Sequence, residues 1–187
     1  MRRVNVIGAL AIAALALACR RPEKATTETT SATEEHPAPV AALTHEEKEL
    51  MTKAARGGVA EVALGKLAVQ RGASADVKAF GQRMVTDHQK ANEELAQLAA
   101  KKGVVLPHEV GHDEQETIIK LSKLSGPKFD KEYADDMVDD HEDDVKELRE
   151  AVRDVKDPDV RAWAEKTLPV FEEHLAKAKE LKQKHDR

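Results

Sequence analysis

The sequence predicts an all-α protein whose main domain is a four-helix bundle, and three observations lead to this expectation. Charged residues make up 35% of the 187-residue chain and aromatic residues only 3%, a composition typical of helical bundles. Apolar residues recur with helical spacing in four long segments, which Gly and Pro residues separate. No segment has the alternating pattern of a half-buried strand.

The first two predicted helices form a tight hairpin. The run Thr44-His45-Glu46-Glu47 is a capping box, in which the Thr and Glu side chains satisfy each other's backbone donors. The first helix extends from this box to about Arg71. Ser74 caps the second helix, which extends to Lys102 and ends before Gly103. The turn between the two helices is short, so they are expected to pack antiparallel.

A second pair of helices follows a long connector. Gly126-Pro127 opens the third long helix, which extends to about Lys156, and Asp157-Pro158 opens the fourth, which extends to about Lys184. The connector over residues 103–126 contains a short amphipathic helix, expected over 114–124. Two tight hairpins joined by one long crossover is the ferritin-like arrangement of a four-helix bundle.

The N-terminal segment predicts export. Residues 1–18 have a basic start, a short apolar centre and a small-residue end, as in a secretory signal, and the apolar centre is too short to span a bilayer. Cys19 follows directly and is the only cysteine in the chain, which favours lipid attachment at Cys19 over ordinary cleavage. Arg20 favours the outer membrane as the destination. Ordinary cleavage after Ala18 would instead give a soluble periplasmic protein.

The remaining chain divides into a tether and the bundle domain. Residues 19–43 are polar, Thr-rich and interrupted by Pro, so they have too little apolar surface to fold and are expected to form a flexible tether. Residues 44–187 form the bundle domain. Removal of Arg2 and Arg3 with the signal takes the formal net charge from −5 to −7. No basic patch with interleaved aromatic residues exists, so no nucleic-acid partner is expected.

Each long helix carries one potential metal ligand on its apolar stripe. In chain order these residues are Glu61, His88, His141 and His174. All four lie near the middle of their helices, so they can meet at one level of the bundle. Neutral imidazoles with a carboxylate suit zinc, iron or copper. The pattern predicts a site for a divalent transition metal, and its alternative is a structural network of buried Glu and His side chains.

An acidic residue precedes each of the three histidines. These residues are Asp87, Asp140 and Glu173, and we expect them to orient the imidazole rings. A di-iron site of the ferritin type requires Glu three positions before a histidine on two helices. Val85, Val138 and Phe171 occupy those positions here, so the sequence argues against a di-iron oxidase.

A separate pattern resembles a zinc-peptidase motif. His108-Glu109-Val110-Gly111-His112 matches H-E-x-x-H, in which both histidines must share one face of a helix. Here the motif lies in the predicted connector, just after Pro107, and contains a glycine. A zinc metallopeptidase is therefore a remote alternative. The sequence does not decide whether the protein is an enzyme, and it favours a protein without enzymatic activity.

The chain resembles a bacterial family known as domain of unknown function 4142, described as predicted outer-membrane proteins with a ferritin-like helical bundle. The motifs that carry the resemblance are residues 60–68 (AEVALGKLA), 77–80 (VKAF), 84–88 (MVTDH), 126–130 (GPKFD) with Tyr133 and His141, and 168–169 (LP) with His174-Leu175. The resemblance implies a bundle in the cell envelope and supplies no activity. The leading hypothesis is an envelope lipoprotein that binds a transition metal, with a role in stress protection. Its alternative is a non-catalytic structural or interaction module.

Overall fold

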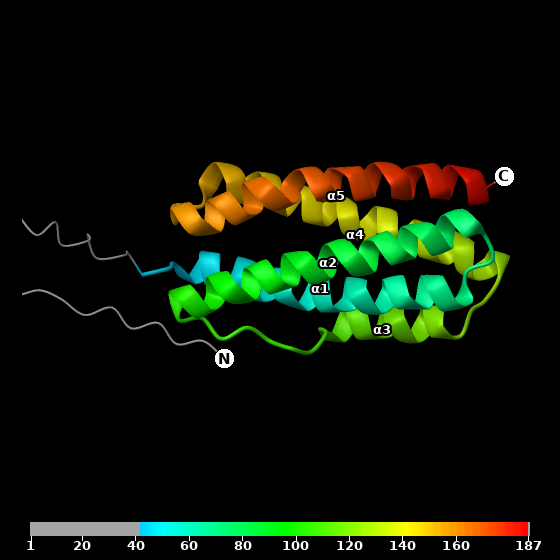
Figure 1. The fold of residues 1–187 in the computed structure, drawn as a ribbon, viewed down its shortest axis with the longest axis horizontal. Helices are drawn as coiled ribbons and strands as arrows, with labels where there is room; N and C mark the ends of the chain where they lie inside the picture. Colours follow the sequence, from blue (N-terminus) through cyan, green and yellow to red (C-terminus); the bar gives the residue numbers. More distant parts are fainter. Residues whose placement is uncertain (1–41, 187) are drawn as a thin grey trace, which may run out of the picture. The chain divides into compact units, whose positions relative to one another are not determined.

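The computed structural model describes residues 42–186, and these residues form five α-helices and no β-strand (Figure 1). The helices are α1 (His45–Arg71), α2 (Ala75–Lys102), α3 (His112–Ser122), α4 (Pro127–Asp154) and α5 (Pro158–His185). The predicted all-α bundle is confirmed, and every long helix ends within two residues of its expected limit. Residues 1–41 lie outside the described part of the chain. They include the predicted secretory signal, Cys19 and all but the last two residues of the predicted tether.

The short connector helix begins two residues earlier than expected. Gly111 serves as its N-cap, because the Gly111 carbonyl accepts a hydrogen bond of 3.0 Å from the backbone N–H of Gln115. Asp113 and Glu114 then lie in the first turn, where carboxylates interact favourably with the helix dipole. The signal for this helix start is therefore the acidic first turn rather than a side-chain cap.

Two antiparallel hairpins make up the bundle. α1 packs on α2 and α4 packs on α5, while α2 also contacts α5. The short helix α3 lies beside α1 (Figure 1) and makes a smaller contact with α4. Lys102 at the end of α2 pairs with Asp157 at the start of α5, whereas Gly126 at the start of α4 donates a hydrogen bond to Arg71 at the end of α1. The chain therefore leaves α2 at one end of the bundle and enters α4 at the other. The long connection between the hairpins is as predicted, and the ferritin-like assignment stays a prediction.

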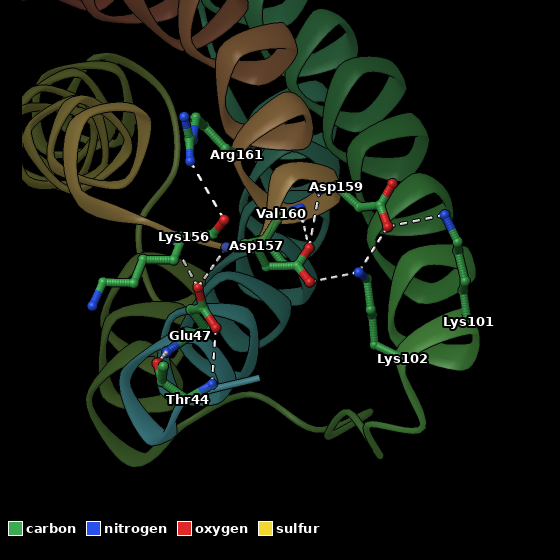
Figure 2. Close-up of polar contacts among 9 residues, drawn as sticks. All are labelled: Thr44, Glu47, Lys101, Lys102, Lys156, Asp157, Asp159, Val160 and Arg161. Atoms are coloured by element: carbon green, nitrogen blue, oxygen red, sulfur yellow. Dashed lines mark hydrogen bonds and ion pairs between the residues drawn. The ribbon is translucent and has the colours of Figure 1, made fainter. Parts of the chain in front are cut away.

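A buried carboxylate holds each interhelical turn in place. Glu47, in the first turn of α1, accepts hydrogen bonds from the backbone N–H groups of Thr44 (2.8 Å), Lys156 (3.0 Å) and Asp157 (2.9 Å) (Figure 2). The capping box predicted at Thr44 is thus extended to the turn between α4 and α5. The backbone hydrogen bonds lower the pKa of Glu47, although burial acts to raise it.

Asp130 holds the turn between α1 and α2 in the same way, at the other end of the bundle. Its two carboxylate oxygens accept hydrogen bonds of 2.8 Å from the backbone N–H groups of Ala73 and Ser74, in the turn between α1 and α2. Asp130 is itself in the first turn of α4 and is almost fully buried. Each hairpin therefore fixes the turn of the other through a charged acceptor, an interaction worth more than a neutral hydrogen bond.

The apolar interior consists of two clusters with a polar layer between them. One cluster contains Met84, Phe129 and Tyr133, and the other contains Leu95 and Trp163. The second cluster also includes Leu43, which directly precedes Thr44. None of the described helices has an apolar stretch long enough to cross a membrane. On each long helix the predicted metal ligand lies between residues of the two clusters. These ligands are Glu61, His88, His141 and His174.

Candidate metal centre

Three helices each bring one histidine to the polar layer. His88 of α2, His141 of α4 and His174 of α5 are at most 1% exposed. Each occupies the position where the apolar stripe of its helix passes from one hydrophobic cluster to the other. The helical period therefore aims all three rings at the bundle axis, as the sequence predicted.

The three imidazoles form a compact triangle. Their ring centroids are 5.7 Å apart for His88 and His141, and 5.4 Å apart for the other two pairs. One nitrogen from each ring lies within 4.8 Å of the others, a grouping that can hold a metal ion. Around tetrahedral zinc, with Zn–N bonds of about 2.0–2.1 Å, ligand nitrogens lie about 3.3 Å apart. The rings need to move inward by only about an ångström to reach this geometry.

Hydrogen bonds on the outer side fix the tautomers of two of the rings. His141 Nδ1 lies 3.0 Å from the carbonyl oxygen of Met137, so Nδ1 carries the proton and Nε2 carries the lone pair. His174 Nε2 lies 2.9 Å from Asp87 Oδ2, so in that ring Nδ1 carries the lone pair. Within residues 42–186, neither His141 Nε2 nor His174 Nδ1 has a hydrogen-bond partner, and the same is true of both ring nitrogens of His88.

The environment keeps the three rings neutral. Burial lowers the pKa of His88 well below its usual range, and the neighbouring His141 and His174 lower it further. Burial and His174 lower the pKa of His141 to about 3, although the hydrogen bond to Met137 opposes this change. Burial also lowers the pKa of His174 against the opposing effect of Asp87. Lone pairs are therefore available for a metal at neutral pH.

Of the three acids that precede the histidines, only Asp87 bonds to a ring. It holds His174 of α5 rather than its neighbour His88, and Arg83 Nε lies 3.1 Å from the same carboxylate oxygen. Hydrogen bonds from His174 and Arg83 lower the pKa of Asp87, against burial, which acts to raise it. Glu173 is exposed and pairs with Arg83, and Asp140 lies on the exposed side of α4.

The fourth predicted ligand, Glu61, stands apart from the triangle. It is 3% exposed, and its Oε1 lies 4.0 Å from His141 Nδ1, the nitrogen already bound to Met137. Burial raises the pKa of Glu61 well above its usual range, and the acids Asp140, Asp144 and Asp136 of α4 raise it further. Glu61 therefore lies behind His141, at the seam between α1 and α4, where burial favours the protonated form of its carboxyl group.

Two residues that the sequence pattern did not single out as parts of the site, Phe171 and Arg83, contribute to the centre. Phe171 packs against all three histidines, with ring centroids 4.7 Å from His88, 5.7 Å from His141 and 5.9 Å from His174. Arg83 holds Asp87 in place. Its spacing of four residues before Asp87 was the available signal, because residues at i and i+4 on a helix face each other.

The zinc-peptidase pattern lacks the geometry that this chemistry needs. His112 is the first residue of α3, and His108 precedes the helix in irregular backbone. Both side chains are exposed, and the ring of His112 lies beside Asp113 and Glu116. The two histidines do not share a helix face, so the structure gives no support to a metallopeptidase site here.

Comparisons with known proteins agree with this fold. A crystal structure of a DUF305 fragment from Deinococcus radiodurans superimposes with a TM-score of 0.68 at 10% sequence identity, covering 77% of this chain and 99% of that one. At this identity the likeness shows the fold alone. No curated protein matches the sequence. The model of the domain of unknown function DUF4142 matches residues 32–181, most of the chain and all of the histidine layer. The chain therefore belongs to the DUF4142 family.

Proposed function

We propose that this protein is an envelope lipoprotein that binds one divalent transition-metal ion through His88, His141 and His174. The observation that carries the proposal is the set of four buried ring nitrogens without a hydrogen-bond partner, which belong to three neighbouring rings. A buried nitrogen left unpaired costs about 1–3 kcal/mol, so such groups are rare in folded proteins unless they serve a purpose. A bound metal satisfies one nitrogen of each ring at once.

The hydrogen bonds of the other nitrogens support the same proposal. Histidines that bind metals usually donate their second N–H to a carboxylate or a backbone carbonyl, which fixes the tautomer and raises the basicity of the ligand. Asp87 is such a carboxylate for His174, and Met137 supplies such a carbonyl for His141. A purely structural network of polar side chains would instead be expected to pair the inner nitrogens with one another.

The ligand atoms favour a borderline or soft metal. All three donors are neutral imidazole nitrogens, which suit zinc, copper and iron, whereas magnesium, calcium and manganese prefer carboxylate and carbonyl oxygens. Glu61 lies outside the triangle, and the carboxylate of Asp87 contacts the centre through His174. Retention of a reactive metal in the buried interior of the bundle fits a role in protecting the cell envelope from metal stress.

The envelope location rests on residues 1–19 of the sequence. A basic start, a short apolar segment and Cys19 support export and lipid attachment. Labelling of cells with radioactive palmitate tests this part of the proposal separately. The wild-type chain is expected to incorporate label in the outer-membrane fraction and the Cys19→Ala variant to lose it; label-free wild-type protein would contradict lipid attachment.

Metal uptake by the purified protein tests the central part. The chain is loaded with zinc, copper or cobalt, desalted and analysed for metal content. One metal ion per chain is expected in the wild type, with loss in His88→Ala, His141→Ala and His174→Ala. The His108→Ala/His112→Ala double variant is the matched control and is expected to bind normally. A wild type that retains none of the three metals would overturn the proposal.

A further inference from the structure

One nitrogen of His88 is not accounted for by a metal bound to the three histidines. Within the described part of the chain, four ring nitrogens of the cluster have no hydrogen-bond partner, and two of these four belong to His88. Met137 and Asp87 already bond to the outer nitrogens of His141 and His174. Because a metal takes one nitrogen from each ring, the second nitrogen of His88 still needs a partner.

A small cavity adjoins His88. It has a volume of about 30 Å³, and each of the four long helices contributes to its wall. Of the three histidines, only His88 lines it. A polar cavity of this size has room for about two water molecules. The cavity can therefore supply a hydrogen-bond partner to the one ring that lacks an outer partner.

Two acidic residues and an asparagine also line this cavity. They are Asp144, Glu147 and Asn92. Carboxylate and amide oxygens accept hydrogen bonds from water, and a water molecule can at the same time accept one from an imidazole N–H. A lining with two carboxylates therefore favours water, which donates hydrogen bonds to the wall, over an anion.

Asp144 is the better placed of the two carboxylates to serve His88. Glu147 is already engaged, because its Oε1 lies 3.0 Å from Lys53 Nζ. Asp144 follows His141 by three residues on α4, so it lies within one helical turn of the histidine layer. Burial, together with the charges of Asp140 and Glu147, raises the pKa of Asp144 to about 7. At about pH 8 its carboxyl group is therefore largely ionised and accepts hydrogen bonds.

We propose that water in this cavity joins the outer N–H of His88 to the carboxylate of Asp144, which makes Asp144 a positioning residue for the metal centre. This inference rests on the proposed metal centre. Histidines that bind metals usually donate their second N–H to a carboxylate, a backbone carbonyl or water, and loss of such a partner lowers metal affinity by about 10–100-fold. The water link gives His88 the partner that Asp87 gives His174 directly, and it fixes which nitrogen of His88 is free to bind the metal.

Substitutions of Asp144 in the full chain test the link through zinc affinity, measured at about pH 8 by competition with a chelator. Asp144→Leu removes both acceptor oxygens and is expected to weaken zinc binding by about 10–100-fold. Asp144→Asn keeps one acceptor oxygen and is expected to weaken it by only about 2–10-fold. Asp143→Asn is the matched control and is expected to bind zinc as the wild type does, because Asp143 is exposed and does not line the cavity.

Nuclear magnetic resonance of the zinc-loaded protein, with ¹⁵N-labelled histidine, gives a readout that a change in packing alone would not move. In the wild type the ring N–H proton of His88 is expected to exchange magnetisation with water, and Asp144→Leu is expected to lose this transfer. The ring N–H protons of His141 and His174 bond to protein oxygens, so their signals are expected to be the same in both proteins.

The outcomes separate the water link from the metal centre itself. Zinc content is measured in every variant. Zinc binding without water contact at the ring N–H of His88 in the wild type overturns the link and leaves the metal centre standing. Unchanged zinc affinity in Asp144→Leu overturns it as well, and so do equal losses in Asp144→Leu and Asp144→Asn, which would assign the effect to charge. A wild type that takes up no zinc overturns both proposals together.

Discussion

Asp87 Oδ2 lies 2.9 Å from His174 Nε2, so the residue that precedes one histidine of the cluster holds another histidine on a different helix. This contact links α2 to α5 at the level of the proposed metal. A carboxylate in this position makes the opposite nitrogen of the ring a better ligand, and it supplies part of the negative charge that a divalent ion requires.

Asp87→Asn is therefore expected to weaken metal binding without preventing it. The variant keeps a hydrogen-bond acceptor but loses the charge, and a decrease in affinity of about 10–100-fold is expected from the removal of such a partner. Competition with a chelator of known affinity measures the change. Glu173→Gln is the control, since Glu173 is exposed and pairs with the surface side chain of Arg83. An equal decrease in both variants would assign the effect to surface charge rather than to the bond with His174.

His88→Leu is expected to raise the stability of the metal-free protein while abolishing metal binding. Both ring nitrogens of His88 are buried and unpaired, so an apolar residue of similar size removes a desolvation cost of about 1–3 kcal/mol. Chemical denaturation in the presence of a chelator measures the free energy of unfolding. A large loss of stability in this variant would favour a structural polar network over a metal site.

The half-buried carboxyl group of Asp136 on α4 is expected to make the stability of the protein depend on pH, and substitution of this residue is expected to remove that contribution. Burial, with the charge of Asp140, raises the pKa of Asp136 to about 7, whereas its ordinary value is 3.8. Between these values the folded protein holds a proton that the unfolded chain has lost, so this group makes stability fall as pH rises toward 7.

Asp136→Asn is therefore expected to stabilise the protein at about pH 8, by an amount on the order of 1 kcal/mol, with a smaller gain at about pH 4.5. The buried histidines have lowered pKa values and act in the opposite direction below about pH 6.5, but they are common to both proteins. Thermal unfolding of the variant and the wild type at the two pH values isolates the contribution of Asp136. A difference between the two proteins that does not depend on pH would show that Asp136 ionises normally.

The carboxylates that hold the two turns are expected to matter most for stability. Glu47→Ala removes the acceptor for three backbone N–H groups, and Asp130→Ala removes the acceptor for two. Each change is expected to cost roughly 3 kcal/mol, because hydrogen bonds to charged groups are strong and the donors are left unpaired. Glu49→Ala is the control, since Glu49 lies on α1 close to Glu47 but is exposed and pairs with the exposed His45. A cost similar to that of the control would show that these turns do not depend on the carboxylates.

The sequence predicted the helices and the level of the histidines well, because both depend on local information. Capping residues fixed the helix ends, and the period of the apolar stripe placed His88, His141 and His174 at the bundle axis. The position of Glu61 was harder to predict, because the apolar stripe of α1 packs against two neighbouring helices. Gly65 on this helix packs so closely on α2 that a Cβ atom would lie 2.6 Å from the carbonyl oxygen of Gly81. This contact sets the rotation of α1, and no local pattern reveals that Glu61 then lies behind His141.

The side chains that contact the histidine rings could not be predicted from sequence patterns for a similar reason. Asp87 was expected to serve a histidine, but its bond to His174 depends on how α2 and α5 pack. Phe171 was noted only as the residue that replaces a glutamate of the di-iron pattern, whereas its ring covers all three histidines. Contacts between helices, rather than along them, decide these features.

X-ray absorption spectroscopy of the zinc-loaded protein tests the three-histidine centre most directly, because it identifies the ligand atoms and their distances. A metal bound by His88, His141 and His174 is expected to show three imidazole nitrogens at about 2.0–2.1 Å and a fourth light ligand from solvent. The Asp87→Asn variant is expected to keep this set. Coordination dominated by carboxylate oxygens, or zinc bound with fewer than three imidazoles, would contradict the account.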